Sequence, residues 1–444
     1  MPYAFEFKIK AKTNQYTAID EAILTGQFIG NKCIRLSMDQ RSIGKTQLYK
    51  YCSRLAKEFA FANKLNSQAR QAMAEKGWSS TSRFYDNCHK KIPRKKVVRL
   101  RDDYSYKGKC TKRGYPNFKR HSRSIEYKNT GWNLSEDRKY ITFTNKLGIG
   151  KLKLKGNWDF YFDQLEQIKR IRLIKRANGY YCQFLIQADI NVKTTPTQRA
   201  TGLDLGLNYF ITDISGNVVE SPKYYRKAEK KLNRLNRRKC RKYQNPGKGK
   251  KGAKMVKIPK QRQSNNYHKA RVRYATKHFK VSRQREDFAT LLTKCVIQST
   301  DLVAYKDLNV KGMVKNRHLA KSINDAGCST FRHWLEHFGR KYGKANVVVP
   351  PHNTSQNYSS WGQKVGKFLS TRTQICHHCG FVEHRDLNTR LNILQKGLST
   401  VGHTESNATL REAASRLRGE TPSSCVGEIL HDYGGTFNQG SLSL

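Results

Sequence analysis

Apolar and polar positions alternate at the start of the chain and then take on helical spacing. The opening YAFEFKIKAKT has the two-residue period of a strand with one solvated face. Further on, apolar residues recur every three or four positions at Leu48, Cys52, Leu55, Phe59 and Ala62. We therefore expect residues 1–40 to supply N-terminal strands of a β domain and residues 41–125 to form a helical insert.

Residues 126–195 return to a β pattern. The segment IKRIRLIKRANGYYCQFLIQADI holds two apolar-rich runs around Asn178 and Gly179, a dipeptide that favours a tight hairpin turn. The run YITFTNKLGIGKLKLKG precedes it. Together these segments predict a small antiparallel β domain or barrel, which the N-terminal strand can join.

Residues 196–347 predict mixed α/β layers. ATGLDLGLNYFITDISGNVVE reads as a buried strand, a turn at Ser215–Asn217 and a returning strand. Two basic helices within residues 224–295, joined by a Gly/Lys-rich loop, lead to the strand DLVAYKDL. A helix with Phe331, Leu335 and Phe338 on one stripe precedes the strand ANVVVPP. This β-β-α-β order is typical of α/β layers.

The charge of the chain defines its partner. Lys and Arg number 86 against 33 Asp and Glu, a formal net charge of +53, so the chain repels itself until a polyanion neutralises it. The partner that this balance predicts is nucleic acid. A membrane surface is the rival, but no apolar run approaches the length of a spanning helix and the cations are spread over the whole sequence.

The expected compartment is the cytoplasm, in association with the nucleoid. The N-terminus lacks a charged segment followed by an apolar one, so we expect no secretory signal. Most of the 11 cysteines are scattered without framework spacing, which suits reduced thiols.

Two basic regions are candidate nucleic-acid surfaces. In residues 90–123 cations interleave with aromatic residues, which suits phosphate neutralisation and base stacking, although a solvated basic loop with packed tyrosines explains the same pattern. The candidates there are Arg94, Lys95, Lys96, Tyr104 and Tyr106. The candidates on the two basic helices are Arg234, Arg237, Arg238, Arg241, Lys242, Arg271, Arg273, Lys277 and Arg283.

Two carboxylates stand in unusual places. Asp204 in GLDLGL interrupts an apolar strand between glycines, where an ionised group needs a partner or a cation. Asp386 in HRDLNTRLNIL precedes a helical pattern and on its own favours an ordinary helix cap.

Several motifs in matched order resemble one family. TGLDLGL, VAYKDLNVKGM, NTSQNYSSWGQ and CHHCGFVEHRDLNTRLNIL are similar to segments of the TnpB proteins of bacterial insertion sequences, relatives of type V CRISPR effectors. The resemblance extends from about residue 165 to 395. It implies an RNase H-like RuvC domain, an N-terminal wedge-like β-barrel with a helical recognition insert, a zinc-ribbon-like insert and a guide RNA that pairs with one strand of double-stranded target DNA.

The resemblance gives Asp204 and Asp386 a catalytic role. They match the first and third carboxylates of an Asp/Glu/Asp triad that holds two magnesium ions, which replaces the cap interpretation of Asp386. Lys306 occupies the glutamate position, and its ammonium would pair with Asp204 or Asp386 instead of binding metal. Three neighbours are possible substitutes: Asp307, which on a strand points to the opposite face, and Glu286 and Asp287.

The implied zinc site departs from the family pattern as well. Family members carry two CxxC pairs, whereas Tyr358 and Trp361 stand at the first pair and only Cys376 and Cys379 remain. The histidines that could complete a site are His352, His377, His378 and His384. We expect a knuckle packed by aromatic side chains more than a zinc-loaded one, and zinc binding stays open.

The expected domain order combines these segments. Residues 1–40 and 126–195 form the wedge-like domain, residues 41–125 the recognition insert, residues 196–347 and 383–396 the RuvC-like domain, residues 348–382 the zinc-ribbon-like insert and residues 397–444 a disordered tail. The expected function is RNA-guided DNA binding with cleavage lost or impaired. The alternatives are an active magnesium-dependent endonuclease with a rearranged carboxylate, and a decayed basic RNA-binding remnant of a transposon.

Overall fold

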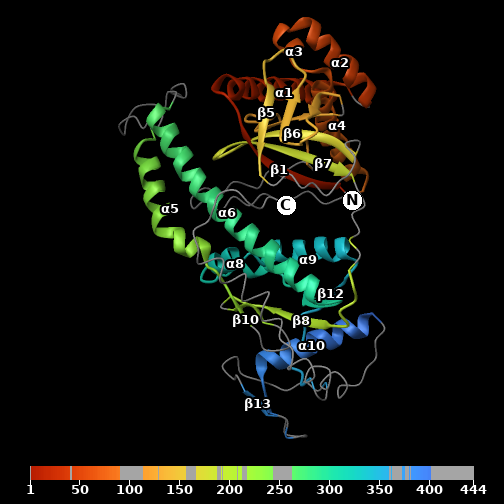
Figure 1. Ribbon diagram of the computed structural model, residues 1–444, viewed down its shortest axis with the longest axis vertical. Helices are drawn as coiled ribbons and strands as arrows, with labels where there is room; N and C mark the ends of the chain where they lie inside the picture. Colours follow the sequence, from red (N-terminus) through yellow and green to blue (C-terminus); the bar gives the residue numbers. More distant parts are fainter. Residues whose placement is uncertain are drawn as a thin grey trace. The chain divides into compact units, whose positions relative to one another are not determined.

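The computed structural model divides the chain into two compact units, one up to Asp189 and one from Ile190 onward. The residues that the structure describes are 2–40, 43–90, 114–128, 130–156, 167–187, 192, 194–207, 209–212, 218–243, 263–359, 362, 373–375, 380 and 382–401. The tail from residue 402, expected to be disordered, lies outside them. Figure 1 shows the helices and strands of the two units, coloured along the sequence.

The N-terminal unit is a seven-stranded antiparallel sheet with helices packed on it. Its strands are β1 (Pro2–Lys10), β2 (Ser124–Tyr127), β3 (Trp132–Leu134), β4 (Tyr140–Phe143), β5 (Gly150–Lys155), β6 (Ile168–Arg176) and β7 (Gly179–Gln187). Its helices are α1 (Thr13–Asp39), α2 (Lys45–Glu58), α3 (Ala60–Lys64) and α4 (Ser67–His89). The strand order β2-β6-β7-β1-β5-β4-β3 places the first strand of the chain at the centre of the sheet.

The predicted hairpin and the predicted joining of the N-terminal strand are confirmed. β6 and β7 pair from Ile168 and Ile186 up to Arg176 and Gly179, and Gly179 has a positive φ of 137° that a residue with a side chain rarely adopts. β1 pairs with both β5 and β7. The described pairings run in an open order between the edge strands β2 and β3, so closure into a barrel stays a prediction.

One prediction in this unit is wrong. Residues 13–39, which we assigned to N-terminal strands, form the 27-residue helix α1. Its buried residues Ile19, Ala22, Ile23 and Ile29 follow helical spacing, and they pack against α4 and the sheet. Thr25, Gly26 and Gly30 also lie on this buried face, and residues with low helix propensity weaken a helical signal in the sequence.

The C-terminal unit is built on a five-stranded mixed sheet of order β10-β9-β8-β11-β12. Its strands are β8 (Ala200–Leu205), β9 (Tyr209–Thr212), β10 (Val218–Glu220), β11 (Leu302–Lys306) and β12 (Ala345–Val349), with a separate pair β13 (Thr373–Ile375) and β14 (Val382–His384). Its helices are α5 (Tyr224–Arg241), α6 (Asn265–Ser299), α7 (Val310–Met313), α8 (Ala320–Ala326), α9 (Cys328–Tyr342) and α10 (Arg385–Thr400).

The sheet combines an antiparallel and a parallel half. β8, β9 and β10 form an antiparallel meander, while β11 and β12 run parallel to β8. The segment predicted as two strands thus forms three, because the first of them is interrupted at Gly206 and Leu207, between β8 and β9. The turn at Ser215–Asn217 lies outside the described residues. This topology agrees with the expected α/β layers.

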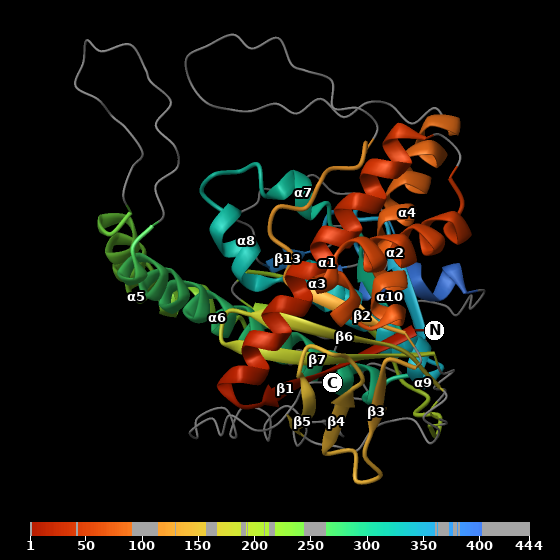
Figure 2. The same cartoon turned by 90° about the horizontal axis from the view of Figure 1, so that it is seen from above.

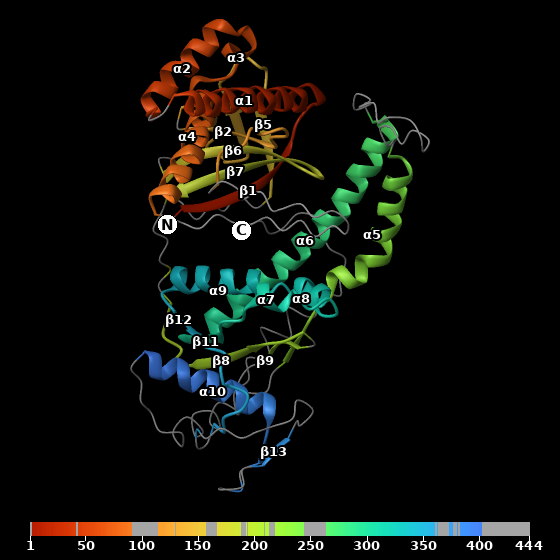
Figure 3. The ribbon, with the colours of Figure 1, turned by 180° about the vertical axis from the view of Figure 1, so that it is seen from behind.

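Helices cover both faces of the sheet (Figure 3). On one face, Val303 and Tyr305 of β11 share a core with Phe288 of α6 and Phe331 of α9. On the other face, Leu302 and Ala304 pack against Ile393 and Leu394 of α10, as the strand period requires. Side chains at even-numbered positions of β11 therefore point toward α10.

Glycines bring the backbone of α10 directly onto the sheet. A Cβ at Gly202 in β8 would lie 2.3 Å from the carbonyl oxygen of Arg390 and 2.9 Å from the amide nitrogen of Leu394. A Cβ at Gly397 would lie 2.5 Å from the Cβ of Ala304. These contacts hold α10 directly against one face of the sheet. Asp386, in the first turn of α10, is therefore positioned on the same face.

None of the helices among the described residues combines the length and the apolar character needed to cross a bilayer.

Candidate functional site

Lys306 ends the buried strand β11, and its ammonium faces Asp204. The Nζ atom of Lys306 donates a hydrogen bond to Oδ1 of Asp204 over 2.9 Å. The two residues follow the paired positions Tyr305 and Leu203 in the parallel register of β11 and β8. Lys306 is 9% exposed, so the pair lies at the rim of the core with little water around the ammonium. The pairing of Lys306 with Asp204, one of the two partners that we predicted, is present.

The chemistry of this pair does not suit a magnesium site. Mg²⁺ is bound in proteins through carboxylate and carbonyl oxygens and water, whereas an ammonium has only donors and carries the same sign of charge as the metal. To bind Mg²⁺, Asp204 would have to give up a charge-assisted hydrogen bond, and the cation would sit beside Lys306. Among the described residues, no group of three or more His, Cys, Asp and Glu side chains is placed to hold a metal ion together.

Asp386 lies in the first turn of α10, on the side of the sheet toward which Lys306 points. Its side chain is 38% exposed, and its Oδ1 atom lies 4.0 Å from the Nε atom of Arg385. One turn further on, Arg390 donates a hydrogen bond from its Nε to the carbonyl oxygen of Asp386 over 2.8 Å. A carboxylate in a first helical turn is also favoured by the helix dipole.

The substitute carboxylates are directed elsewhere. Asp307 pairs with Arg332 of α9, so it faces away from α10, as the alternation of a strand predicts. Glu286 and Asp287 belong to α6, which packs on the α9 side of the sheet, and Glu286 pairs with Arg283 over 3.3 Å. Burial raises the pKa of Asp287 to about 6, the nearby charge of Glu286 adds to this rise, and Arg283 opposes it.

Buried asparagines of α10 hold the turn that carries Tyr358, a feature that sequence analysis missed. Asn388 donates from Nδ2 to the carbonyl oxygen of Asn357 over 2.7 Å and accepts from the Ser359 amide over 2.7 Å. Asn392 donates to the carbonyl oxygen of Thr354 over 3.0 Å. The sequence did carry a signal for this contact. Asn388 and Asn392 are four residues apart, so they lie on the same side of a leucine-rich helix, and polar residues on a buried helix side need hydrogen-bond partners.

Most of the candidate zinc ligands lie outside the residues that the structure describes. Tyr358, at a family cysteine position, is buried with 4% exposure. His352 lies exposed in a turn, where its carbonyl oxygen accepts a hydrogen bond from Lys396. Cys376, Cys379, His377, His378 and Trp361 lie outside the described residues, as does the side chain of His384. The zinc predictions therefore stay predictions.

The two predicted basic helices form a long hairpin, in which α5 and α6 lie side by side (Figure 2). Among the described residues of the hairpin, a small cluster of Ala228, Leu232 and Val281 is buried between the two helices. The cations that sequence analysis singled out at Arg234, Arg237, Arg238, Arg241, Lys242, Arg271 and Arg273 are exposed, whereas Lys277 and Arg283 are half-buried. The pKa of Lys277 is lowered by burial and by its neighbours Lys231 and Lys280. This crowding of like charge favours binding of a polyanion.

A buried aspartate anchors this hairpin, and sequence analysis missed it. Lys223, which precedes α5, has the left-handed conformation and provides no side-chain cap. Instead Asp325, at the end of α8 and 5% exposed, accepts hydrogen bonds from the amides of Tyr225 over 2.8 Å and Arg226 over 3.0 Å. A carboxylate at a helix N-terminus satisfies free amides and complements the helix dipole. The five aromatic-basic candidates between Arg94 and Tyr106 lie outside the described residues.

The C-terminal unit thus combines a mixed sheet, a carboxylate on β8, a second carboxylate in the first turn of α10 and a strongly basic hairpin. Residues 183–317 match the family model OrfB_IS605, described as "Probable transposase". Residues 329–393 match the TNB domain of the Cas12f1-like family. These matches confirm the resemblance to TnpB proteins over this part of the chain.

Curated relatives and one solved structure are similar to the chain. A relative from Streptomyces pristinaespiralis, whose name describes an RNA-guided DNA endonuclease, is 30% identical over 226 residues, which cover 50% of this chain and 51% of the relative. InsQ of Escherichia coli (strain K12), with a similar name, is 24% identical over 246 residues, or 52% of this chain and 57% of InsQ. The chain thus spans about half the length of these relatives.

The mini-RNA-guided endonuclease CRISPR-Cas phi3 covers 90% of this chain and 92% of its own length, at 10% identity and a TM-score of 0.47.

Proposed function

We propose that this chain is an RNA-guided DNA-binding protein of the TnpB type in which DNA cleavage is lost or impaired. A guide RNA would pair with one strand of double-stranded DNA next to a short motif, and base pairing would read the sequence. The cations of the α5–α6 hairpin would grip the backbone of the RNA and of the heteroduplex. The observation that carries the proposal is the 2.9 Å hydrogen bond from Lys306 to Asp204 at the position of the family glutamate.

The impairment rests on electrostatics. Asp204 offers an oxygen that is already engaged by an ammonium. Asp307 pairs with Arg332 of α9, and Glu286 and Asp287 lie on α6, which packs on the face opposite to α10. Catalytic metal sites lose activity steeply when a ligand is displaced by about an ångström. Target occupancy needs no metal chemistry, so it is compatible with the same residues.

The wider assignments belong to the same proposal. The N-terminal unit would serve as the wedge and recognition region, and the C-terminal unit as the RuvC-like domain with its zinc-ribbon-like insert. Zinc binding at that insert stays a prediction. Magnesium binding at Asp204 and Asp386 belongs to the alternative of an active endonuclease. The expected compartment is the bacterial cytoplasm, with the protein on the nucleoid.

The test is a binding and cleavage assay on the complex purified with its co-expressed RNA. We expect it to retain matched DNA in a gel-shift experiment, with magnesium present, and to leave that DNA uncut. DNA with a scrambled target is the control for pairing, and the RNA-free protein is the control for charge alone.

Two variants make the test decisive. Cleavage by the natural protein that disappears in Asp204→Ala would overturn the proposed impairment and favour an active endonuclease with a rearranged carboxylate. Cleavage gained by Lys306→Glu would support it. A complex that holds RNA but does not discriminate matched from scrambled DNA would instead indicate the basic RNA-binding remnant.

A further inference from the structure

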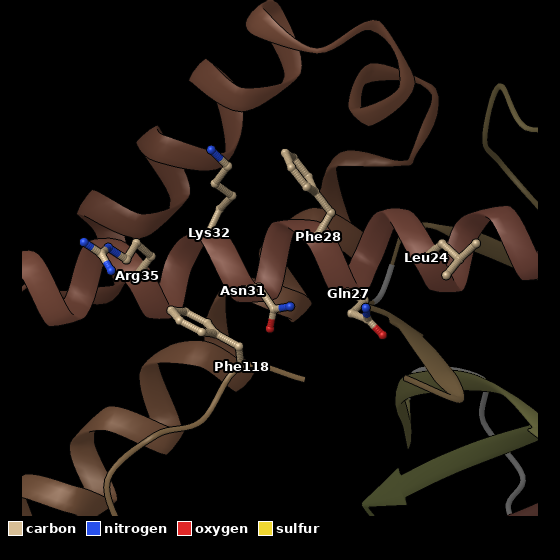
Figure 4. Close-up of a pocket in the computed structure, with 7 residues that line it drawn as sticks. All are labelled: Leu24, Gln27, Phe28, Asn31, Lys32, Arg35 and Phe118. Atoms are coloured by element: carbon tan, nitrogen blue, oxygen red, sulfur yellow. The ribbon is translucent and has the colours of Figure 1, made fainter. Parts of the chain in front are cut away.

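The outward face of α1 in the N-terminal unit carries apolar side chains where an amphipathic helix normally has polar ones. Leu24 is 63% exposed, and Phe28, one turn further on, is only half-buried. Phe118, on the segment that leads to β2, lies alongside this face with 46% exposure (Figure 4). Between them is a groove of about 410 Å³, here called the α1 groove, lined by Leu24, Gln27, Phe28, Asn31, Lys32 and Arg35 of α1 and by Phe118.

The wall of the α1 groove is held by side-chain amides of the helix. Asn31 donates to the carbonyl oxygen of Lys119 over 2.9 Å and accepts from the Lys119 amide over 2.8 Å. Gln27 accepts from the amide of Ser122 over 2.5 Å. These bonds join α1 to the backbone of Lys119 and Ser122, close to Phe118 in the chain. The backbone that carries Phe118 is therefore held in place without any contact of its own ring. They also engage the amides that a base edge would otherwise use.

Aromatic rings and cations surround the α1 groove together. Phe28 packs edge-to-face with Phe59 and with Phe61, each at 5.1 Å between ring centroids, and Phe61 is itself 39% exposed. The Nζ atom of Lys32 lies 5.6 Å from the centroid of the Phe28 ring. An exposed group of large apolar side chains such as this marks a binding surface more often than chance exposure.

The charge around the α1 groove selects the partner. Lys32 lines the groove, and Lys119 and Arg120, the two residues after Phe118 in the sequence, are exposed. Arg35 is partly neutralised by Asp39 at 2.9 Å. A partner that carries flat apolar groups on a negatively charged chain fits both features, and this is the chemistry of an unpaired nucleotide. A purely apolar partner would leave these cations without compensation.

We propose that the α1 groove binds an unpaired nucleotide of RNA, by stacking the base on Phe118 and Phe28 while Lys32 contacts the phosphate, without reading which base it is. Duplex DNA keeps its bases stacked inside the helix, whereas loops and ends of RNA present them. The occupant is an unpaired part of the guide RNA, and to that extent the inference rests on the proposed function.

The test measures the affinity of the full chain, freed of RNA at high salt, for fluorescently labelled probes. The probes are a short oligouridylate, an oligoadenylate, an oligothymidylate DNA and a fully paired RNA duplex. Phe118→Ala is expected to weaken both RNA single strands by about tenfold, because one base-stacking contact is lost. Duplex RNA should change by less than twofold. Phe118→Trp should restore binding, and Tyr209→Ala, which removes an aromatic side chain that is 51% exposed in the other unit, should have no effect.

Each contrary result overturns a different part of the proposal. If Phe118→Ala and the natural chain bind the single-stranded probes with equal affinity, Phe118 does not stack on a base. An unchanged affinity for oligothymidylate would contradict the proposed contacts, because stacking and a phosphate contact do not read the 2′-hydroxyl. A loss confined to one RNA would overturn the absence of base readout. A dimer that becomes monomeric in Phe118→Ala, with nucleic-acid binding unchanged, would assign the α1 groove to a second copy of the chain.

The inference and the proposed function fail separately. If Phe118→Ala loses RNA affinity in a chain that does not discriminate matched DNA, the α1 groove stands and RNA guidance falls. If the natural complex binds matched DNA and Phe118→Ala leaves all affinities intact, the opposite holds.

Discussion

At the scale of single residues, one side chain changes the chemistry of the candidate metal position. Lys306 lies at the end of a strand whose register with β8 places it beside Asp204. A carboxylate at the same place would meet Asp204 as a second oxygen ligand, whereas the ammonium neutralises it. The exchange of one charge therefore converts a possible cation site into an ion pair.

We predict that Lys306→Glu makes the stability of the chain magnesium-dependent. Without metal, the melting temperature should fall, because two carboxylates then face each other at a partly buried place. Magnesium at 100 times its Kd should return about 2.7 kcal/mol by binding only the folded state. Differential scanning fluorimetry with and without Mg²⁺ measures this.

Lys306→Met is the matched control, since it removes the ammonium without adding an oxygen ligand. Its melting temperature should not respond to magnesium, and neither should that of the natural chain. A natural chain that Mg²⁺ stabilises as strongly as it does Lys306→Glu would show that Lys306 leaves the position open to metal.

A second residue-scale prediction concerns Glu126, which is 3% exposed in β2. It pairs with Lys76 at 2.9 Å, Arg170 at 2.8 Å and Arg172 at 3.0 Å. Burial alone would raise the pKa of Glu126, but these cations outweigh it and hold the pKa at about 2, below its ordinary value of 4.5. The contribution of ionised Glu126 to the free energy of unfolding is therefore complete above pH 4.5 and is lost as the pH falls toward 2.

Glu126→Gln should lower the free energy of unfolding at pH 7 by on the order of 3 kcal/mol, because the cations are left without compensation. It should also flatten the loss of stability between pH 4.5 and 2. Urea denaturation at pH 7 and pH 3 compares the two chains, with the exposed Glu58→Gln as control. Parallel pH profiles would contradict the account.

At the scale of elements, two contacts determine where the functional helices lie. The first is the direct contact of α10 with β8 at Gly202, which leaves no space for a Cβ. Gly202→Ala should cost about 1–3 kcal/mol, because the backbone of α10 must move away from the sheet. Chemical denaturation measures the loss.

Gly30→Ala in α1 is the control for the glycine itself, because its Cβ would find ordinary contact at 3.6 Å. That variant should be neutral or gain roughly 0.5–1 kcal/mol, as expected for alanine in a helix. If Gly202→Ala behaves like Gly30→Ala, α10 is not held by close packing at this point.

The second contact is the cap that Asp325 provides to α5 from α8. Asp325→Ala should destabilise the unit by about 2 kcal/mol, because two partly buried amides lose a charged acceptor. Hydrogen exchange at Tyr225 and Arg226 should accelerate first, and RNA affinity should fall as the hairpin loses its anchor. The exposed Glu21→Ala should change neither quantity. Unchanged exchange in Asp325→Ala would show that the cap does not hold the hairpin.

At the scale of the whole molecule, net charge dominates. A chain with a formal charge of +53 should bind RNA with a steep dependence on salt, because each phosphate contact releases counterions. Replacing Arg234, Arg237, Arg238 and Arg241 by glutamine should reduce the slope of log K against log salt by up to about 0.7–0.9 for each cation that contacts phosphate. Filter binding across a salt series gives the slope.

The same four positions changed to lysine are the control, since charge is preserved. Their slope should equal that of the natural chain even if affinity changes through lost bidentate contacts. A glutamine variant with an unaltered slope would place the RNA elsewhere on the molecule.

The sequence by itself determined the features that rest on local pattern and on total charge. The Asn178–Gly179 hairpin, the basic helix pair and the strands that carry Asp204 and Lys306 follow from short-range periodicity and turn chemistry, and the prediction of a polyanion partner follows from composition. The order of motifs also predicted the TnpB resemblance, which the matched family models confirm over residues 183–317 and 329–393.

Only the tertiary structure decided the contacts between residues far apart in the chain. That Asp325 caps α5, and that Lys306 pairs with Asp204 where the sequence left Asp204 and Asp386 open, depend on packing and register, which no local window contains. A period reports which positions are buried, but the partner of a buried charge is set by the elements that the fold brings beside it.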